Sequence, residues 1–140
     1  MVKAEVFRGA RARVLVVDSI TQLGPEDAGC LVVSGSHGGR SSAEFALAQP
    51  VLAVFFNDAG VGKDEAGVAA LAILQARGIA AGVVSHASAR IGDARDAWEN
   101  GVVSRVNPAA AQLGLAAGVP LRGALQALAS SAAPALRAAC

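Results

Sequence analysis

Short apolar runs of strand length alternate along this chain with segments of helical spacing, and this alternation most constrains its fold. The runs span residues 13–17, 31–34, 51–56, 79–84 and 102–106, and residues 3–7 are expected to add an edge strand. The first run is an unbroken Val/Leu stretch after Arg13, which is typical of a strand covered on both faces of its sheet.

The intervening segments predict helices at 43–49, 64–77, 93–100, 109–115 and 120–132. Asp64 and Glu65 place negative charge in the first turn of the second helix, and Asn107-Pro108 supplies an N-cap and a first helical residue for the fourth. Strands alternating with helices at this spacing predict an α/β fold, specifically a three-layer Rossmann-like sandwich with a mostly parallel sheet of about five strands. We expect a single α/β domain over residues 1–140, with a helical C-terminal segment at about 108–133 and a frayed tail at 134–140.

Charge and hydropathy argue against two classes of partner. The 140 residues contain 12 Lys and Arg against 11 Asp and Glu, a net charge of +1, so no basic surface for nucleic acid is predicted. No apolar stretch approaches the ~18 residues that cross a bilayer, and no signal peptide is visible, so we expect no membrane association and a cytoplasmic location. Cys30, in an apolar run, and Cys140, at the last position, do not form a disulfide framework.

Polar, glycine-rich or basic segments follow three successive apolar runs, at residues 34–42, 57–64 and 85–90. The chain has two histidines, His37 and His86, and they occupy near-duplicate Ser-His-Arg settings in the first and third of these segments. Because the carboxyl ends of parallel strands share one edge of the sheet, where ligands bind, we expect these segments to form one rim with a site on it.

The first of these segments has the composition of an anion-binding loop. Gly38 and Gly39 allow backbone amides to approach a ligand, the following helix supplies unpaired N–H groups, and Arg40 can hold a carboxylate or phosphate with two parallel hydrogen bonds. A tight strand-to-helix turn with a serine cap is the alternative interpretation of the same residues.

Three enzyme motifs are matched only in part. Residues 34–38 resemble the nucleophile elbow, with Ser36 as nucleophile and Asp58 and His86 following in the required order, but Ser34 stands where that pattern has glycine. Residues 60–64 lack the first glycine and the hydroxyl of a nucleotide-binding P-loop, which leaves Lys63 as a general cation near an anion or as a surface lysine. No tight ligand spacing indicates a metal site, and we assign no metal ion and no organic cofactor.

These observations lead to one main hypothesis. The chain binds a small anionic metabolite, with a carboxylate as the expected group, at the carboxyl-end rim, and His37 or His86, assisted by Asp58, moves protons in an isomerase, lyase or hydrolase reaction. The candidate catalytic residues are His37, His86, Asp58 and Ser36. The candidate ligand-binding residues are Ser34, Gly38, Gly39, Arg40, Asn57, Gly60, Gly62, Lys63, Ser85, Ser88 and Arg90.

Two further features allow other interpretations. Asp18 ends the first apolar run as Asp58 ends the third, which makes it a second candidate carboxylate, and either residue is also compatible with an ordinary turn. The leucines Leu121, Leu125 and Leu128 form an apolar stripe, so we predict a homo-oligomer. The alternative function is therefore a non-catalytic ligand-binding or accessory subunit of a larger enzyme.

Overall fold

The computed structural model describes residues 1–132, so the predicted tail and Cys140 lie outside the described residues. The strands are β1 (Lys3–Arg8), β2 (Arg13–Val17), β3 (Leu31–His37), β4 (Ala53–Asn57), β5 (Ala80–Val84) and β6 (Val103–Val106). The α-helices are α1 (Arg40–Leu47), α2 (Ala69–Gln75), α3 (Ala94–Asn100), α4 (Pro108–Gln112) and α5 (Leu121–Ser130). Three 3-10 helices join them: η1 (Ile20–Gln22), η2 (Pro25–Asp27) and η3 (Lys63–Val68). No helix within residues 1–132 has the length and apolarity needed to span a membrane.

The six strands form one mixed sheet in the order β1-β2-β3-β4-β5-β6. Strands β2 to β5 are parallel to one another, whereas the edge strands β1 and β6 pair antiparallel with β2 and β5. The predicted α/β class is confirmed, with a mixed sheet whose sixth strand, beyond the five apolar runs, is the expected edge strand near residues 3–7. Its strands follow one another in chain order, whereas the Rossmann order 3-2-1-4-5-6 reverses within the sheet.

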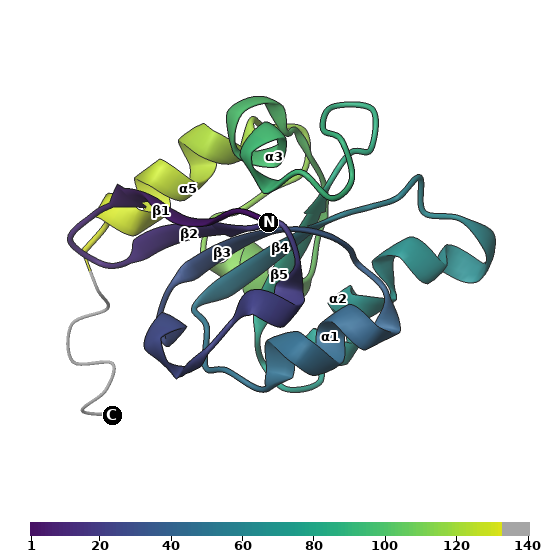
Figure 1. Ribbon diagram of the computed structural model, residues 1–140, viewed down its shortest axis with the longest axis horizontal. Coiled ribbons are helices and arrows are strands. Elements are labelled where there is room, and N and C mark those ends of the chain that lie inside the picture. Colours follow the sequence, from purple (N-terminus) through teal and green to yellow (C-terminus); the bar gives the residue numbers. More distant parts are fainter. Residues whose placement is uncertain (133–140) are drawn as a thin grey trace.

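Helices cover both faces of this sheet (Figure 1). Alternate residues of each central strand face opposite ways, so Phe55 and Val33 pack with residues of α3, α4 and α5, while Phe56 and Val32 pack with residues of α1 and α2. Both faces of the central strands are therefore buried, as the unbroken apolar runs predicted. Trp98 on α3 is buried in the first of these cores, with the guanidinium of Arg122 5.7 Å from its ring centre.

The leucine stripe of α5 is confirmed but is covered by the chain itself. Leu121 and Leu125 are fully buried and Leu128 is 6% exposed, in the core beneath β1 and β2. The stripe therefore offers no free apolar face to a second subunit.

The structure corrects the predicted start of the helix at 64–77. Asp64 and Glu65 have φ of 55° and 57°, in the left-handed region, and lie in η3, so α2 begins only at Ala69. Left-handed backbone breaks the i to i+4 hydrogen-bond ladder, and the two acidic side chains therefore do not occupy the first turn of α2. Helix propensity and the acidic residues favoured a helix here, but neither of them indicates the tight turn that the chain makes after β4.

The strand predicted at 31–34 extends to His37, which pairs with Asn57 of β4 after a register shift. A Cβ on Gly35 would lie 2.7 Å from the carbonyl oxygen of Asp18 and 2.7 Å from the carbonyl carbon of Gly92, so the strand passes between two backbones. The following helix begins at Arg40 and ends at Leu47, three residues before the predicted start and two before the predicted end.

The chain leaves β4 and β5 toward opposite faces of the sheet. The connections after β2, β3 and β4 lead to η1, α1 and α2, whose buried residues share one core, whereas the connection after β5 leads to α3 in the other core. Adjacent parallel strands whose connections diverge in this way leave a crevice at their carboxyl ends, which is where ligands bind in open α/β sheets. Residues 58 and 86 lie there.

Candidate functional site

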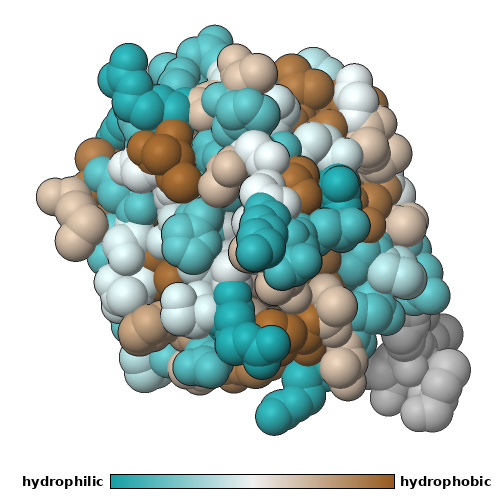
Figure 2. Space-filling model, turned by 90° about the vertical axis from the view of Figure 1, so that its right-hand side faces the viewer, coloured by the Kyte–Doolittle hydropathy of each residue, from teal (hydrophilic) through white to brown (hydrophobic). Residues whose placement is uncertain are grey.

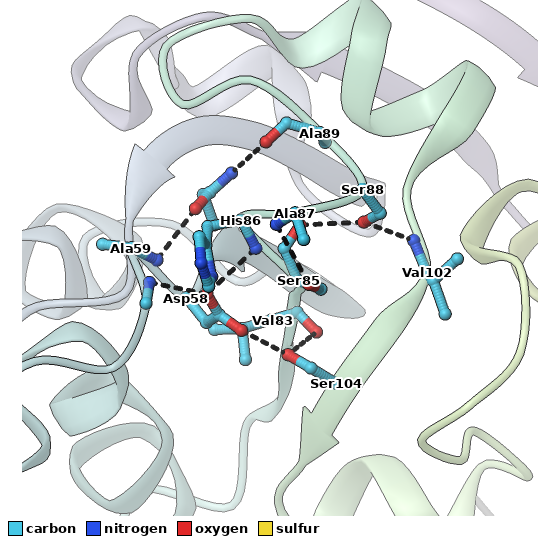
Figure 3. A network of polar contacts seen from close by, with 12 residues as sticks. Asp58, Ala59, Val83, Ser85, His86, Ala87, Ser88, Ala89, Val102 and Ser104 are labelled. Atoms are coloured by element: carbon cyan, nitrogen blue, oxygen red, sulfur yellow. Dashed lines mark hydrogen bonds and ion pairs between the residues drawn. The ribbon is translucent and has the colours of Figure 1, made fainter.

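Asp58 follows β4 directly and is 5% exposed. Its Oδ1 accepts hydrogen bonds from the backbone nitrogens of Gly60 (2.8 Å) and His86 (3.0 Å), and its Oδ2 accepts one from the hydroxyl of Ser104 (2.8 Å). The backbone that follows turns sharply, with φ of 52° at Ala59 and 75° at Gly60. Residues on β6 and at the ends of β4 and β5 thus meet at one carboxylate (Figure 3).

His86 presents its ring to the same carboxylate. Nδ1 lies 3.1 Å from Asp58 Oδ1, and the ring rests over Gly60, where a Cβ would lie 3.6 Å from Cε1. The His86 side chain is 60% exposed, whereas that of Asp58 is 7% exposed. A buried carboxylate therefore orients an imidazole whose opposite edge faces solvent.

The pKa of Asp58 is held below its ordinary value. Burial opposes ionisation, but the hydrogen bonds from Gly60, Ser104 and His86 outweigh that cost because each of them is made to the charged form. Asp58 is consequently ionised at neutral pH. An ionised carboxylate only accepts hydrogen bonds, so the contact with His86 requires a proton on Nδ1, which in the neutral ring leaves the lone pair on Nε2.

Two polar residues of the predicted site hold the surrounding loops in place. Asn57 donates to the carbonyl of Ala89 (3.0 Å) and accepts from the backbone nitrogen of Ala59 (2.8 Å). Ser88 donates to the carbonyl of Ser85 (2.8 Å) and accepts from the backbone nitrogen of Val102 (2.9 Å). Ser85, Ser88 and Ala89 belong to the loop that carries His86, so these bonds support that loop (Figure 3).

The hydroxyls of Ser85 and Ser34 also form hydrogen bonds within the chain. The hydroxyl of Ser85 accepts from the backbone nitrogen of Ala87 (3.1 Å), and that of Ser34 accepts from the backbone nitrogen of Ser36 (3.0 Å). Ser36 lies within β3 instead of on a turn, and its hydroxyl accepts from the backbone nitrogen of Ile20 (3.0 Å). Within the described residues no hydrogen bond joins Ser36 to the Asp58–His86 pair.

His37 lies at the end of β3, one strand away from Asp58. Its ring covers Gly39, the N-cap of α1, where a Cβ would lie 2.5 Å from the ring Cε1. His37 pairs with Asn57, which pairs with Val84, so two inter-strand spacings, or about 10 Å, separate the backbones of His37 and Val84. Both histidines are on the predicted rim, with β4 between them.

His37 and Ser36 line a cavity of about 350 Å³ that the sequence did not predict. It lies between the ends of β2 and β3, the N-terminal turn of α1 and the loop at residues 91–92. Asp18 is part of its wall. The Asp18 carboxylate accepts from the backbone nitrogens of Val2 (2.7 Å) and Ala94 (3.0 Å), so it ties the N-terminus and the start of α3 to β2.

The three predicted cations are exposed side chains near this rim. Arg40 is the first residue of α1, Lys63 opens η3 after the glycines Gly60 and Gly62, and Arg90 lies in the loop before α3. None of the three forms an ion pair within residues 1–132. Figure 2 looks onto the side of the molecule that carries these loops, where hydrophilic surface is interspersed with small hydrophobic patches.

Ser104 and Ser42 are the polar residues of this region that sequence reasoning missed. Ser104 donates to Asp58 from the antiparallel edge strand β6, and Ser42 is buried on α1 in the wall of the cavity. The sequence Val-Ser-Arg-Val of residues 103–106 has no alternation of apolar and polar residues that would indicate the face on which Ser104 lies. Within the described chain, no group of three or more His, Cys, Asp or Glu residues is placed to hold a metal ion.

Comparison of the chain with protein-family models, with curated proteins and with solved structures finds no match. Function is therefore inferred from the geometry of the chain alone.

Proposed function

We propose that this chain is an acid–base enzyme acting on a small anionic metabolite at the carboxyl-end rim of the sheet, with Asp58 orienting His86 as the residue that moves the proton. The observation that carries the proposal is the contact between a buried, ionised Asp58 and the Nδ1 of an exposed His86, at 3.1 Å. A carboxylate that fixes the tautomer and orientation of an imidazole is the recurrent arrangement of a general base.

The proposed chemistry follows from the tautomer. His86 Nε2 takes a proton from the substrate, or in hydrolysis from the attacking water, and the imidazolium that forms is stabilised by the negative charge of Asp58. Nε2 then returns the proton to a different atom of the substrate or to the leaving group, so the proton balance closes without an organic cofactor. Isomerisation, elimination and hydrolysis all need this transfer.

The charge of the rim supports an anionic substrate. Arg40, Lys63 and Arg90 are exposed cations on three of the loops that surround the two histidines, and none of them is neutralised by an ion pair within residues 1–132, so each can attract an anion. With about 10 Å between the strand ends that carry them, His37 and His86 lie at opposite ends of the span of a small metabolite.

Several predictions reach beyond the site itself. A three-layer Rossmann-like description of the fold is supported by helices on both faces of the sheet (Figure 1). A homo-oligomer, a cytoplasmic location and the accessory-subunit alternative stay predictions. The alternative has lost the support that the leucine stripe gave it, because that stripe is covered by β1 and β2.

Proton NMR in D2O tests the proposal before the substrate is identified. The purified protein is incubated with a panel of 2-oxo acids, 3-hydroxy acids and carboxylate esters. Isomerisation, elimination and hydrolysis each change the spectrum, and reversible proton abstraction replaces a C–H by C–D. We expect turnover of at least one compound, and a loss of a hundredfold or more in His86→Gln and in Asp58→Asn.

Glu99→Gln is the matched control, because it removes one negative charge from the exposed surface of α3. Turnover that persists in both His86→Gln and Asp58→Asn contradicts the proposed mechanism. A panel on which the wild-type protein has no activity contradicts the assignment of a small anionic substrate.

A further inference from the structure

The cavity between β2, β3 and α1 has the walls of a ligand site. Its volume, about 350 Å³, is at the small end of the range for small-molecule sites. One side is lined by Ser41 and Ser42 from the first turn of α1, with His37 beside them. Phe45 and Ile91 are also part of the wall, so polar and apolar surfaces share the same cavity.

The first turn of α1 offers uncapped donors to this cavity. Its N-cap is Gly39, which has no side chain and makes no capping hydrogen bond, so the N–H groups of the first turn have no side-chain acceptor. Such a helix end attracts a negative charge, because the N–H groups and the helix dipole both point toward it.

Ser42 gives an independent indication that something polar binds there. The residue is 5% exposed and lines the cavity, yet its hydroxyl makes no hydrogen bond to any other residue of the described chain. Within that chain no fully enclosed side-chain oxygen or nitrogen lacks a partner, so the Ser42 hydroxyl keeps some exposed surface, and the residue lines the cavity. Buried hydroxyls in folded proteins nearly always have a partner. This one is placed to donate to a bound oxygen atom.

The apolar part of the wall is unusual for its exposure. Phe45 is 48% exposed and Ile91 is 50% exposed, and they are two of the most exposed large hydrophobic residues in the described chain. They come from α1 and from the loop after β5, and both contact the same cavity. A ligand with an apolar group would cover them.

Asp18 limits the charge of the ligand. Hydrogen bonds from the backbone of Val2 and Ala94 hold the pKa of Asp18 below its ordinary value, against the cost of burial, so the cavity wall carries a negative charge. A doubly charged anion would be repelled by that charge more strongly than a singly charged one.

We propose that this cavity binds small monocarboxylates that carry an apolar group, with the carboxylate at the N-terminus of α1 against Ser42 and His37 and the apolar group on Phe45 and Ile91. Asp58 and His86 do not line this cavity, so the inference assigns a second binding site on the same rim and goes beyond the proposed function. Binding can be measured without turnover, so the two claims can fail separately.

Titration of the 15N-labelled protein with acetate, isovalerate, phenylacetate and inorganic phosphate, followed through the amide signals of Ser41 and Ser42, tests the inference. We expect saturable shifts with the carboxylates, and affinity that rises by about fourfold for each methylene or methyl group added between acetate and isovalerate. Phosphate should bind more weakly than phenylacetate.

Three variants localise the binding. Ser42→Ala should weaken phenylacetate by roughly ten- to hundredfold, the loss expected for a hydrogen bond to an ionised group. Ser130→Ala, an exposed serine on α5, is the matched control and should bind as the wild type does. Phe45→Ala should remove most of the difference in affinity between isovalerate and acetate, while the affinity for acetate stays unchanged.

Equal effects of Ser42→Ala and Ser130→Ala, phosphate binding as tight as that of phenylacetate, or no saturable shift with any carboxylate overturns the inference. Asp58→Asn separates it from the proposed function. Binding that is lost in Ser42→Ala and retained in Asp58→Asn supports the cavity whatever the turnover. Turnover that depends on Asp58 in a protein whose cavity binds no carboxylate overturns this inference alone.

Discussion

Asp58 contacts His86 twice through one atom: its Oδ1 lies 3.1 Å from the ring Nδ1 and 3.0 Å from the backbone nitrogen. The backbone contact fixes where the loop after β5 begins, and the ring contact fixes how the imidazole is turned. Because the same carboxylate also closes the turn after β4 through Gly60, the site and the local fold depend on one side chain.

Replacement of Asp58 should therefore destabilise the protein. Asp58→Ala leaves the backbone N–H groups of Gly60 and His86 and the hydroxyl of Ser104 without their acceptor, and we expect a loss of about 2–4 kcal/mol in the free energy of unfolding. Urea denaturation measures it. Glu44→Ala, at an exposed carboxylate on α1, should stay within about 0.5 kcal/mol of wild type.

The contribution of Asp58 should depend on pH in a defined direction. Its pKa in the folded chain lies below the ordinary value of 3.8, so its ionised form stabilises the fold at pH values above 3.8. That stability is lost as the pH falls through the folded pKa. The difference in unfolding free energy between wild type and Asp58→Asn should accordingly be present at neutral pH and vanish in acid; a difference that is constant from pH 7 to pH 2 would contradict this role of the carboxylate.

Ser104→Ala tests the residue that sequence reasoning missed. Loss of its 2.8 Å hydrogen bond to Asp58 Oδ2 should raise the pKa of Asp58 toward its ordinary value and cost about 1 kcal/mol of stability. Carboxyl 13C NMR titration reports the pKa of Asp58 directly. If Ser104 only packs against β5, the pKa of Asp58 will be the same in the variant and in the wild type.

Gly35→Ala should disturb the cavity through sterics alone. The added Cβ would meet backbone atoms of Asp18 and Gly92 at 2.7 Å, and backbone cannot move aside as the end of a flexible side chain can. We expect a loss of about 1–3 kcal/mol, the usual cost of overpacking. Gly29→Ala meets no atom within 4 Å but has φ of 79°, so it separates backbone strain from crowding. For both variants, the melting temperature measures the loss of stability, and the NMR shift of the Ser42 amide measures the disturbance of the cavity.

The sequence predicted the strands well, because their signal is local. The runs at 13–17, 51–56 and 79–84 recur as β2, β4 and β5 within two residues, and the Asn107 cap on α4 is confirmed by its 2.9 Å hydrogen bond from the backbone nitrogen of Ala110. The antiparallel pairing of β1 and β6 was not predicted, because strand order and direction depend on contacts between residues far apart in the chain.

The candidate site was predicted only in part, because the rest of it also depends on contacts between residues far apart in the chain. The sequence placed Asp58 and His86 after two successive apolar runs, whereas their contact depends on the pairing of β4 with β5, which the sequence did not predict. The roles of Ser104 and Ser42 depend on a third strand and on a helix face, so no local spacing indicated them. Asn57 and Ser88 have the residue types of a binding site, but their hydrogen bonds hold loops.

The tautomer of His86 decides whether Asp58 orients the imidazole for proton transfer, and long-range 1H–15N NMR of the ring nitrogens reports it at a pH where the ring is neutral. We predict a protonated Nδ1 and an unprotonated Nε2 in the wild type, and loss of this preference in Asp58→Asn, because the Asp58 carboxylate fixes the proton on Nδ1. Protonation of Nε2 in the wild type, or the same tautomer in both proteins, would contradict the proposed role of the pair.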